Sequence, residues 1–296
     1  MNELKFIEYL RKNIKTKADV VVGIGDDTAV IRYTKNKYLL FASDMIIEGV
    51  HFTKGTNPYA IGWKAAAVNI SDIAAMGGVP KYIVISVGVP KKNRERTLLG
   101  ITKGAKDICK RFGVSIVGGD TNSSNKTIVV DVAIIGYVSK KHLLTRSGAR
   151  VSDLVFVTGS LGEGKFKHLD FIPRIRESQV LVNNFKINSM IDISDGLFID
   201  LTRVCTSSGV GACIYKSQIP VSPKAPDFRT AVGYGEDFEL VFTLSTKQAR
   251  RLLIYSVKEG FAVKLIGKIG HKKNGIKMIS EQGSVEKIKP LGYTHF

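Results

Sequence analysis

Hydrophobic and polar residues follow one another along the first half of the chain in blocks that favour strands and helices in turn. Short runs rich in valine, isoleucine and leucine predict four strands, over residues 37–44, 81–89, 114–117 and 127–138. Apolar residues at helical spacing predict two helices, over residues 57–78 and 94–113. The first of these ends at Gly77 and Gly78, with Pro80 beyond. This half is therefore predicted to be an α+β unit.

The second half repeats the pattern. It predicts strands over residues 154–159, 211–215, 237–244, 261–270 and 275–280, and helices over residues 195–209 and 246–260. The last two strands are expected to be joined by a turn at Asn274 and Gly275, as in a hairpin. Residues 142–153 carry turn residues without a hydrophobic period. We therefore expect two domains, residues 1–138 and residues 139–296.

The composition agrees with a folded two-domain chain. At 296 residues and 44% hydrophobic, the sequence exceeds the usual size of a single core. Its apolar runs are too short or too interrupted to span a bilayer, and residues 1–13 lack a signal-peptide core, so a cytoplasmic protein is expected. Its three cysteines lack CxxC spacing, which indicates neither a disulfide framework nor a thiolate zinc site.

The formal net charge of +18 raises nucleic-acid binding as an alternative function. However, the lysines and arginines lie in scattered small clusters beside turns, with no long basic arm and no aromatic RNA-binding motif. A solvated basic surface is the preferred interpretation, and neither a specific nucleic acid nor a membrane is expected as a partner.

Residues 153–166 (DLVFVTGSLGEGKF) nearly match the phosphate-binding loop of P-loop nucleotide hydrolases. Gly159, Gly164 and Lys165 have the correct spacing, but Phe166 stands where a hydroxyl should hold Mg²⁺. The motif also requires a helix whose amides face the phosphates, whereas the following residues lack helical periodicity and include Pro173. The stretch is therefore interpreted as a glycine turn after a strand.

Acidic residues gather at turns and strand ends, often beside glycine. They are Asp26, Asp27, Asp44, Asp120, Glu236 and Asp237, in the segments GIGDD, FASD, IVGGD and GYGED. Asp72, Asp192 and Asp195 lie in apolar surroundings, where an ionised carboxylate is costly without a cation or hydrogen bonds. Each residue alone fits a helix cap or a turn, as Asp195 does before the helix that follows it.

Taken together, these residues predict a divalent-metal cluster, because Mg²⁺ prefers carboxylate oxygens and is commonly shared with substrate phosphates. Asn69 and Asp72 are three residues apart on a predicted helix, so they share a face and are placed to reach one metal. By itself, His51 fits an ordinary half-buried histidine. The joint interpretation is phosphate transfer through bridging metals.

The ordered set of these motifs resembles the thiamine-monophosphate kinase family. The segments are GIGDDTAVI, SDMIIEGVHF, KAAAVNISDIAAMGGVP, IVGGDTN, LTRSGAR, MIDISDGL and GEDFELVF, and the likeness runs from about Gly23 to the terminal GYTHF. That family belongs to an ATP-binding superfamily that includes aminoimidazole ribonucleotide synthetase and selenophosphate synthetase. The resemblance implies an α+β fold of two domains, in which the N-terminal domains of two subunits form a β-barrel and hence a homodimer.

The implied activity is transfer of the γ-phosphate of ATP to thiamine monophosphate, giving thiamine diphosphate, with several Mg²⁺ ions in the site. Carried over by motif, the implied metal ligands are Asp27, Ser43, Asp44, Asp72, Asp120, Asp192 and Asp195. The implied ATP contacts are Gly119, Asp120, Arg146 and Ser194, and the implied contacts to the thiamine substrate are His51, Glu236 and Tyr293. Catalytic roles are implied for Asp72, Asp120, Arg146 and Asp195.

The chain departs from the family pattern in two places. Ala42 stands where the family often has a hydroxyl residue, and the segment of residues 162–188 is shorter than usual. Sister families fit less well, because no cysteine precedes Cys109 and the terminal GYTHF lacks a cysteine. A related enzyme that uses ATP on another small metabolite is the alternative, and a basic nucleic-acid-binding protein is the alternative from a different class.

Overall fold

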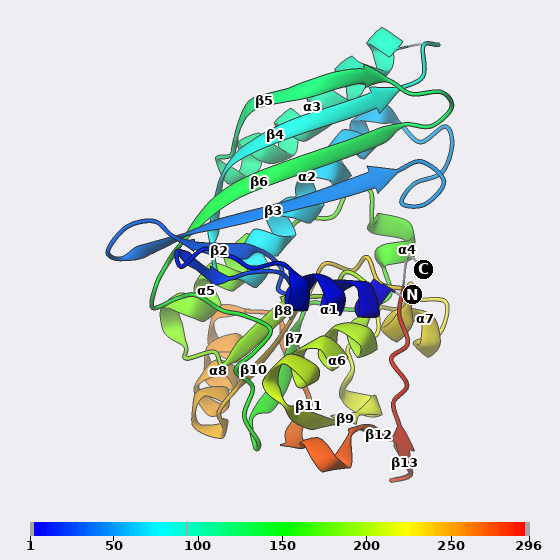
Figure 1. Ribbon diagram of the computed structural model, residues 1–296. Helices are drawn as coiled ribbons and strands as arrows, with labels where there is room; N and C mark the ends of the chain where they lie inside the picture. Colours follow the sequence, from blue (N-terminus) through cyan, green and yellow to red (C-terminus); the bar gives the residue numbers. More distant parts are fainter. Residues whose placement is uncertain (1–2, 93, 294–296) are drawn as a thin grey trace.

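Two mixed β-sheets with helices packed on them make up the computed structural model, which describes residues 3–92 and 94–293 (Figure 1). The first sheet has six strands in the order β1-β2-β3-β6-β4-β5. Its strands are β1 (Val20–Val22), β2 (Ala29–Arg32), β3 (Lys37–Ile47), β4 (Val79–Val89), β5 (Ser115–Ser123) and β6 (Val129–Ser139). The strands β3 and β5 run further than predicted, because each is paired along its length, β3 with β6 and β5 with β4.

Two long helices, α2 (Pro58–Ala75) and α3 (Arg94–Phe112), lie side by side on one face of this sheet (Figure 1). Glycine allows their close approach, since a Cβ atom added to Gly62 would lie 1.8 Å from the carbonyl oxygen of Ile101. The predicted end of α2 is confirmed, with Gly77 in the left-handed region at φ 71°. Among the described residues no helix, α2 included, is long and apolar enough to cross a membrane.

The opposite face of the first sheet exposes apolar side chains. All nine residues of β5 are exposed. Phe41 and Met45 on β3 and Tyr82 and Val84 on β4 are 40–49% exposed. Within the described chain these six strands form an open sheet and not a closed barrel. We call this surface the open face.

The second sheet has seven strands in the order β13-β12-β9-β11-β7-β10-β8. They are β7 (Leu154–Thr158), β8 (Ser189–Asp192), β9 (Val210–Tyr215), β10 (Leu240–Leu244), β11 (Val263–His271), β12 (Ile276–Ile279) and β13 (Val285–Lys287). The remaining helices are α1 (Glu3–Asn13), α4 (Gly164–Lys167), α5 (Ile175–Asn184), α6 (Leu197–Ser208), α7 (Phe228–Gly233) and α8 (Thr246–Glu259), with short 3₁₀ turns at Lys216–Gln218 and Lys272–Asn274. Helix α5 joins the two halves, since the Ser178 hydroxyl donates to the carbonyl of Ala74 on α2 at 2.6 Å.

The predicted hairpin between the last two long strands is wrong. The strands β11 and β12 both pair with β9, on its two sides, and β12 runs parallel to it. The turn ending at Gly275 carries the chain across β9, where Gly211 leaves room for it: a Cβ atom there would lie 2.4 Å from the Gly275 carbonyl oxygen. The asparagine and glycine therefore form a crossing turn and do not fold β12 back on β11.

Candidate active site

Three aspartates from distant parts of the sequence converge where α2 meets β8. Asp27 precedes β2, Asp72 lies on α2, and Asp192 is the last residue of β8. One carboxylate oxygen from each lies within 4.8 Å of the other two. We call Asp27, Asp72 and Asp192 the aspartate trio.

The trio is electrostatically incomplete without a cation. Burial raises the pKa of Asp72 and of Asp192 well above the usual range, and the neighbouring carboxylates raise both further. The Oδ2 atom of Asp27 is buried and has no hydrogen-bond donor among the described residues. An orphaned carboxylate oxygen of this kind is costly, and hard oxygen donors are what Mg²⁺ binds. The donor set therefore fits a divalent cation.

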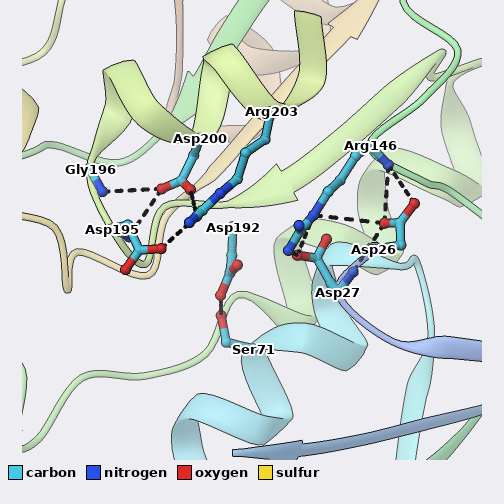
Figure 2. Close-up of polar contacts among 9 residues, drawn as sticks. All are labelled: Asp26, Asp27, Ser71, Arg146, Asp192, Asp195, Gly196, Asp200 and Arg203. Atoms are coloured by element: carbon cyan, nitrogen blue, oxygen red, sulfur yellow. Dashed lines mark hydrogen bonds and ion pairs between the residues drawn. The ribbon is translucent and has the colours of Figure 1, made fainter. Parts of the chain in front are cut away.

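Arg146 neutralises part of this charge from the irregular segment between the two sheets. Its Nη2 and Nε atoms lie 2.6 and 3.1 Å from Oδ1 of Asp27, and its backbone amide donates to both Asp26 oxygens at 3.2 Å (Figure 2). Burial, and next the charge of Asp27, raise the pKa of Asp26 to about 7. Arg146 thus occupies Oδ1 of Asp27 and leaves Oδ2 for another partner.

Residues beside the trio hold its members in place. The Ser71 hydroxyl, which the sequence did not single out, donates to Oδ2 of Asp192 at 2.5 Å (Figure 2). Burial raises the pKa of Asp44, and a hydrogen bond with Asp72 partly offsets that increase, which places Asp44 beside the trio. Asn69, expected to share a metal with Asp72, instead accepts from the Asp44 amide at 3.1 Å and donates to the Ala65 carbonyl at 3.0 Å. Asn69 is therefore a support for Asp44 in this structure, and a metal shared with Asp72 stays a prediction.

Asp195 is bound to an arginine on the next helix. The Nη1 atom of Arg203 lies 2.5 Å from Oδ2 of Asp195 and 2.5 Å from Oδ1 of the buried Asp200 (Figure 2). Burial raises the pKa of Asp200 to about 7, against the opposing charge of Arg203. Helix α6 is capped by Gly196 without a side-chain bond, so the expected capping by Asp195 is wrong. Arg203 and Asp200 were not predicted from the sequence, although they lie one helical turn apart on the helix that follows DISDG.

Two of the three expected substrate contacts, Glu236 and Tyr293, bind the segment of residues 194–195. The amide of Glu236 donates to the carbonyl of Ser194 at 2.7 Å, and the amide of Tyr293 donates to the carbonyl of Asp195 at 3.0 Å. The ring Nδ1 of His51 accepts from the Ile47 amide at 3.0 Å, so this histidine is held by its own turn. Glu236 and Tyr293 therefore adjoin the acidic segment that supplies Asp192 and Asp195.

A buried lysine that was not predicted from the sequence links His51 and Glu236. Lys64 on α2 is 1% exposed, donates to the His51 carbonyl at 2.8 Å and forms an ion pair with Oε1 of Glu236. Its Nζ atom also lies 2.7 Å from Nδ1 of His168. No sequence pattern brings these positions together, because Lys64 and Glu236 are 172 residues apart.

The glycine turn of residues 159–164 is filled by the protein itself. The amides of Gly162 and Gly164 each donate at 2.9 Å to Oδ1 of Asp237, so a carboxylate stands where a P-loop would hold a phosphate. The helix that follows, α4, has only four residues, and Phe166 is 59% exposed. Asp237 is therefore separate from the trio and belongs to the structure of this turn.

Three expected site residues lie away from the trio. Gly119 and Asp120 are on β5, and β5 and β2 are separated by three strands, about 19 Å at the usual spacing. Gly119 and Asp120 help to line a cavity of about 310 Å³ between α3 and strands β4 and β5. Ser43 is exposed on the side of β3 opposite Asp44, and its hydroxyl donates to Asp131 at 3.0 Å. A single chain does not bring these residues to the trio.

Comparison with known proteins identifies the family. Residues 25–138 match the family described as AIR synthase related protein, N-terminal domain. The thiamine-monophosphate kinase of Buchnera aphidicola subsp. Acyrthosiphon pisum is 35% identical, with 98% of this chain and 97% of that protein covered. The Bacillus subtilis enzyme of the same name is 31% identical over the full length of both. A solved structure described as AaThiL complexed with AMPPCP and TMP has a TM-score of 0.83 at 28% identity, covering 100% of this chain and 97% of that one. The chain belongs to the thiamine-monophosphate kinase family, with the α+β fold of the aminoimidazole ribonucleotide synthetase superfamily.

Proposed function

We propose that the protein transfers the γ-phosphate of ATP to thiamine monophosphate and so forms thiamine diphosphate in the cytoplasm. The observation that carries the proposal is the aspartate trio, whose buried oxygens converge and include one without a donor among the described residues. Phosphoryl transfer depends on positioning and on neutralising charge, since two polyanions have to meet. The relative solved with both AMPPCP and TMP supports ATP and thiamine monophosphate as the two substrates.

The cation that we propose for the trio is Mg²⁺. Asp27, Asp72 and Asp192 would hold it, with Asp44 and Asp195 as further ligands. Bound there, Mg²⁺ would neutralise phosphate charge and orient the group in transfer. Arg146 already contacts Asp27, and we propose that it donates charge-assisted hydrogen bonds to an ATP phosphate, with Ser194 as a second ATP contact.

We further propose that the active enzyme is a homodimer joined through the open face. The exposed apolar residues of β3, β4 and β5 support a partner sheet there, which would close the barrel between N-terminal domains of residues 1–138. The C-terminal domains would then comprise residues 139–296. In this arrangement Ser43, Gly119 and Asp120 of one subunit would complete the metal and ATP site of the other, which accounts for their distance from their own trio.

The direct test is product formation by the purified protein. It is incubated with MgATP and a panel of phosphorylated vitamins, and thiamine diphosphate is followed by chromatography. We expect thiamine monophosphate to be the preferred acceptor. Preference for a different phosphorylated or hydroxylated metabolite would overturn the substrate assignment, while leaving the family intact.

The composite site has its own test, based on two inactive variants. We expect Asp72→Asn and Asp120→Asn to lose nearly all activity separately. When subunits are mixed and exchanged, half of the dimers are mixed and one of their two sites is intact, so about one quarter of wild-type activity should return. No recovery on verified subunit exchange would show that each site is built within one subunit.

A further inference from the structure

Lys64 occupies an unusual position for a lysine. It is 1% exposed, and its three contacts come from segments far apart in the chain: the His51 carbonyl, the His168 ring and the Glu236 carboxylate. Lysine is rarely buried to this extent unless its charge is paired. We call Lys64, His168 and Glu236 the lysine cluster.

His168 lies beside both charged groups of the lysine cluster. Burial, and next the positive charge of Lys64, lower the pKa of His168 to about 4, so the ring is neutral at neutral pH. Its Nδ1 atom lies 2.7 Å from Nζ of Lys64, which has only donors, and 3.1 Å from Oε2 of Glu236, whose ionised carboxylate has only acceptors. His168 therefore contacts both charged groups of the cluster.

Glu236 is fixed at both its backbone and its side chain. Its φ of 58° lies in the left-handed region, which is costly for a residue with a side chain and requires support from the surroundings. Its amide donates to the Ser194 carbonyl at 2.7 Å, and Lys64 binds Oε1. Burial raises the pKa of Glu236, and the charge of Lys64 opposes that increase. Lys64 thus favours the ionised carboxylate in this one orientation.

The position of the lysine cluster indicates which part of the substrate it is placed to contact. Lys64 and Asp72 are eight residues apart on α2, about 12 Å along the helix axis. A carboxylate such as Glu236 repels phosphate but attracts a cationic ring or an amino group, both of which thiamine carries. We propose that Lys64 is a positioning residue, which holds Glu236 ionised and correctly oriented to bind the heterocyclic part of thiamine monophosphate. This inference rests on the proposed function.

The test compares two cationic side chains, Lys64 and Arg174, that both bind the loop of residues 234–239. Lys64→Met removes the charge bound to Glu236 and keeps an apolar side chain of similar length. Arg174→Met is the matched control, because Arg174 binds Glu239 on that loop, with Nε 2.7 Å from Oε2, and touches no expected substrate contact. We expect Lys64→Met to raise the KM for thiamine monophosphate by about tenfold or more, with the KM for MgATP and the kcat within about threefold of wild type. Arg174→Met should leave both KM values unchanged, and Lys64→Arg should restore part of the affinity.

Two outcomes would overturn the inference. One is an unchanged KM for thiamine monophosphate in a folded Lys64→Met protein. The other is an equal rise in this KM in Arg174→Met, which would mean that any loss of loop stability weakens substrate binding and that Lys64 has no specific role. If Lys64→Met fails to fold, His168→Leu and His168→Asn replace it, since His168 follows α4, is only half-buried and contacts both Lys64 and Glu236. Leucine should raise the KM for thiamine monophosphate, and asparagine, which keeps an acceptor near Nδ1, should not; equal values would also overturn the inference. Absence of thiamine monophosphate phosphorylation by the wild type would instead overturn the proposed function.

Discussion

The glycine turn of residues 159–164 and the aspartate trio differ in whether their polar groups are paired within the protein. In the turn, the amide donors of Gly162 and Gly164 are satisfied by the carboxylate of Asp237. In the trio, acceptors converge and Oδ2 of Asp27 has no donor among the described residues. A region whose polar groups are all paired internally has no capacity left for a ligand, whereas a region with unpaired buried groups requires one. The glycine motif in the sequence therefore misleads, and the acidic turns mark the site.

The largest effect that separates the two regions should come from removing divalent metal. If the trio holds the cation that neutralises the phosphates, a chelator should abolish thiamine diphosphate formation, and excess Mg²⁺ should restore it. The measurement is the steady-state rate before and after chelation, with circular dichroism to establish that the fold persists. Turnover that survives exhaustive chelation would contradict the assignment of the trio.

Asp72→Asn should lower the activity of the enzyme and raise the stability of the metal-free protein. It removes one negative charge from the trio, so we expect the kcat to fall by about 10²-fold or more, as when other electrostatic stabilisers of a transition state are lost. In metal-free protein the same change relieves repulsion among buried carboxylates, and it should raise the free energy of unfolding. Chemical denaturation with chelator present measures the second effect. Lower metal-free stability together with retained activity would contradict this account.

Substitution of Asp237, which binds the glycine turn, should lower the stability of the protein. Asp237→Ala leaves the amides of Gly162 and Gly164 without their acceptor, so we expect a loss of about 1–3 kcal/mol in the free energy of unfolding. Asp237→Asn is the matched control, since its Oδ1 atom still accepts from both amides. Urea unfolding at about pH 4, below the raised pKa of Asp237, compares the three proteins, and equal stability of alanine and wild type would show that Asp237 does not hold the turn.

Asp237 also predicts a pH dependence. Burial raises its pKa from 3.8 to about 6, against the hydrogen bonds from Gly162 and Gly164. Between these two values the folded state binds more protons than the unfolded chain, so this group's contribution to stability is present below about pH 4 and falls as the pH rises to about 6. The wild type should lose about 2 kcal/mol in this window relative to Asp237→Asn, whose amide does not titrate. A constant difference between the two proteins from pH 4 to pH 7 would contradict the raised pKa.

The smallest effect should come from Lys165→Ala. In a P-loop this lysine would contact the β- and γ-phosphates, but here it follows a turn that Asp237 already fills. We expect the kcat and both KM values to stay within about twofold of wild type, as for a surface substitution. A large fall in kcat would restore the P-loop interpretation.

Much of the fold could be predicted from the sequence, because it depends on local signals. The helix α2 has apolar residues at helical spacing and ends in glycine, and the acidic residues of the trio lie at motif positions that the chain itself displays. The hairpin at Gly275 was predicted wrongly, since pairing of both strands with β9 depends on tertiary contacts. The lysine cluster was missed for the same reason, because Lys64 resembles any lysine on a helix until Glu236, 172 residues away, is placed beside it.

A binding measurement can show which of the two regions receives the phosphates of ATP. Isothermal titration calorimetry with Mg²⁺ and AMPPCP is carried out on the wild type, Asp72→Asn and Lys165→Ala, each confirmed as folded. We predict that Asp72→Asn weakens Mg²⁺-dependent binding by about tenfold or more, while Lys165→Ala binds as the wild type does. Unchanged binding by Asp72→Asn together with weakened binding by Lys165→Ala would contradict the account and place the phosphates at the glycine turn.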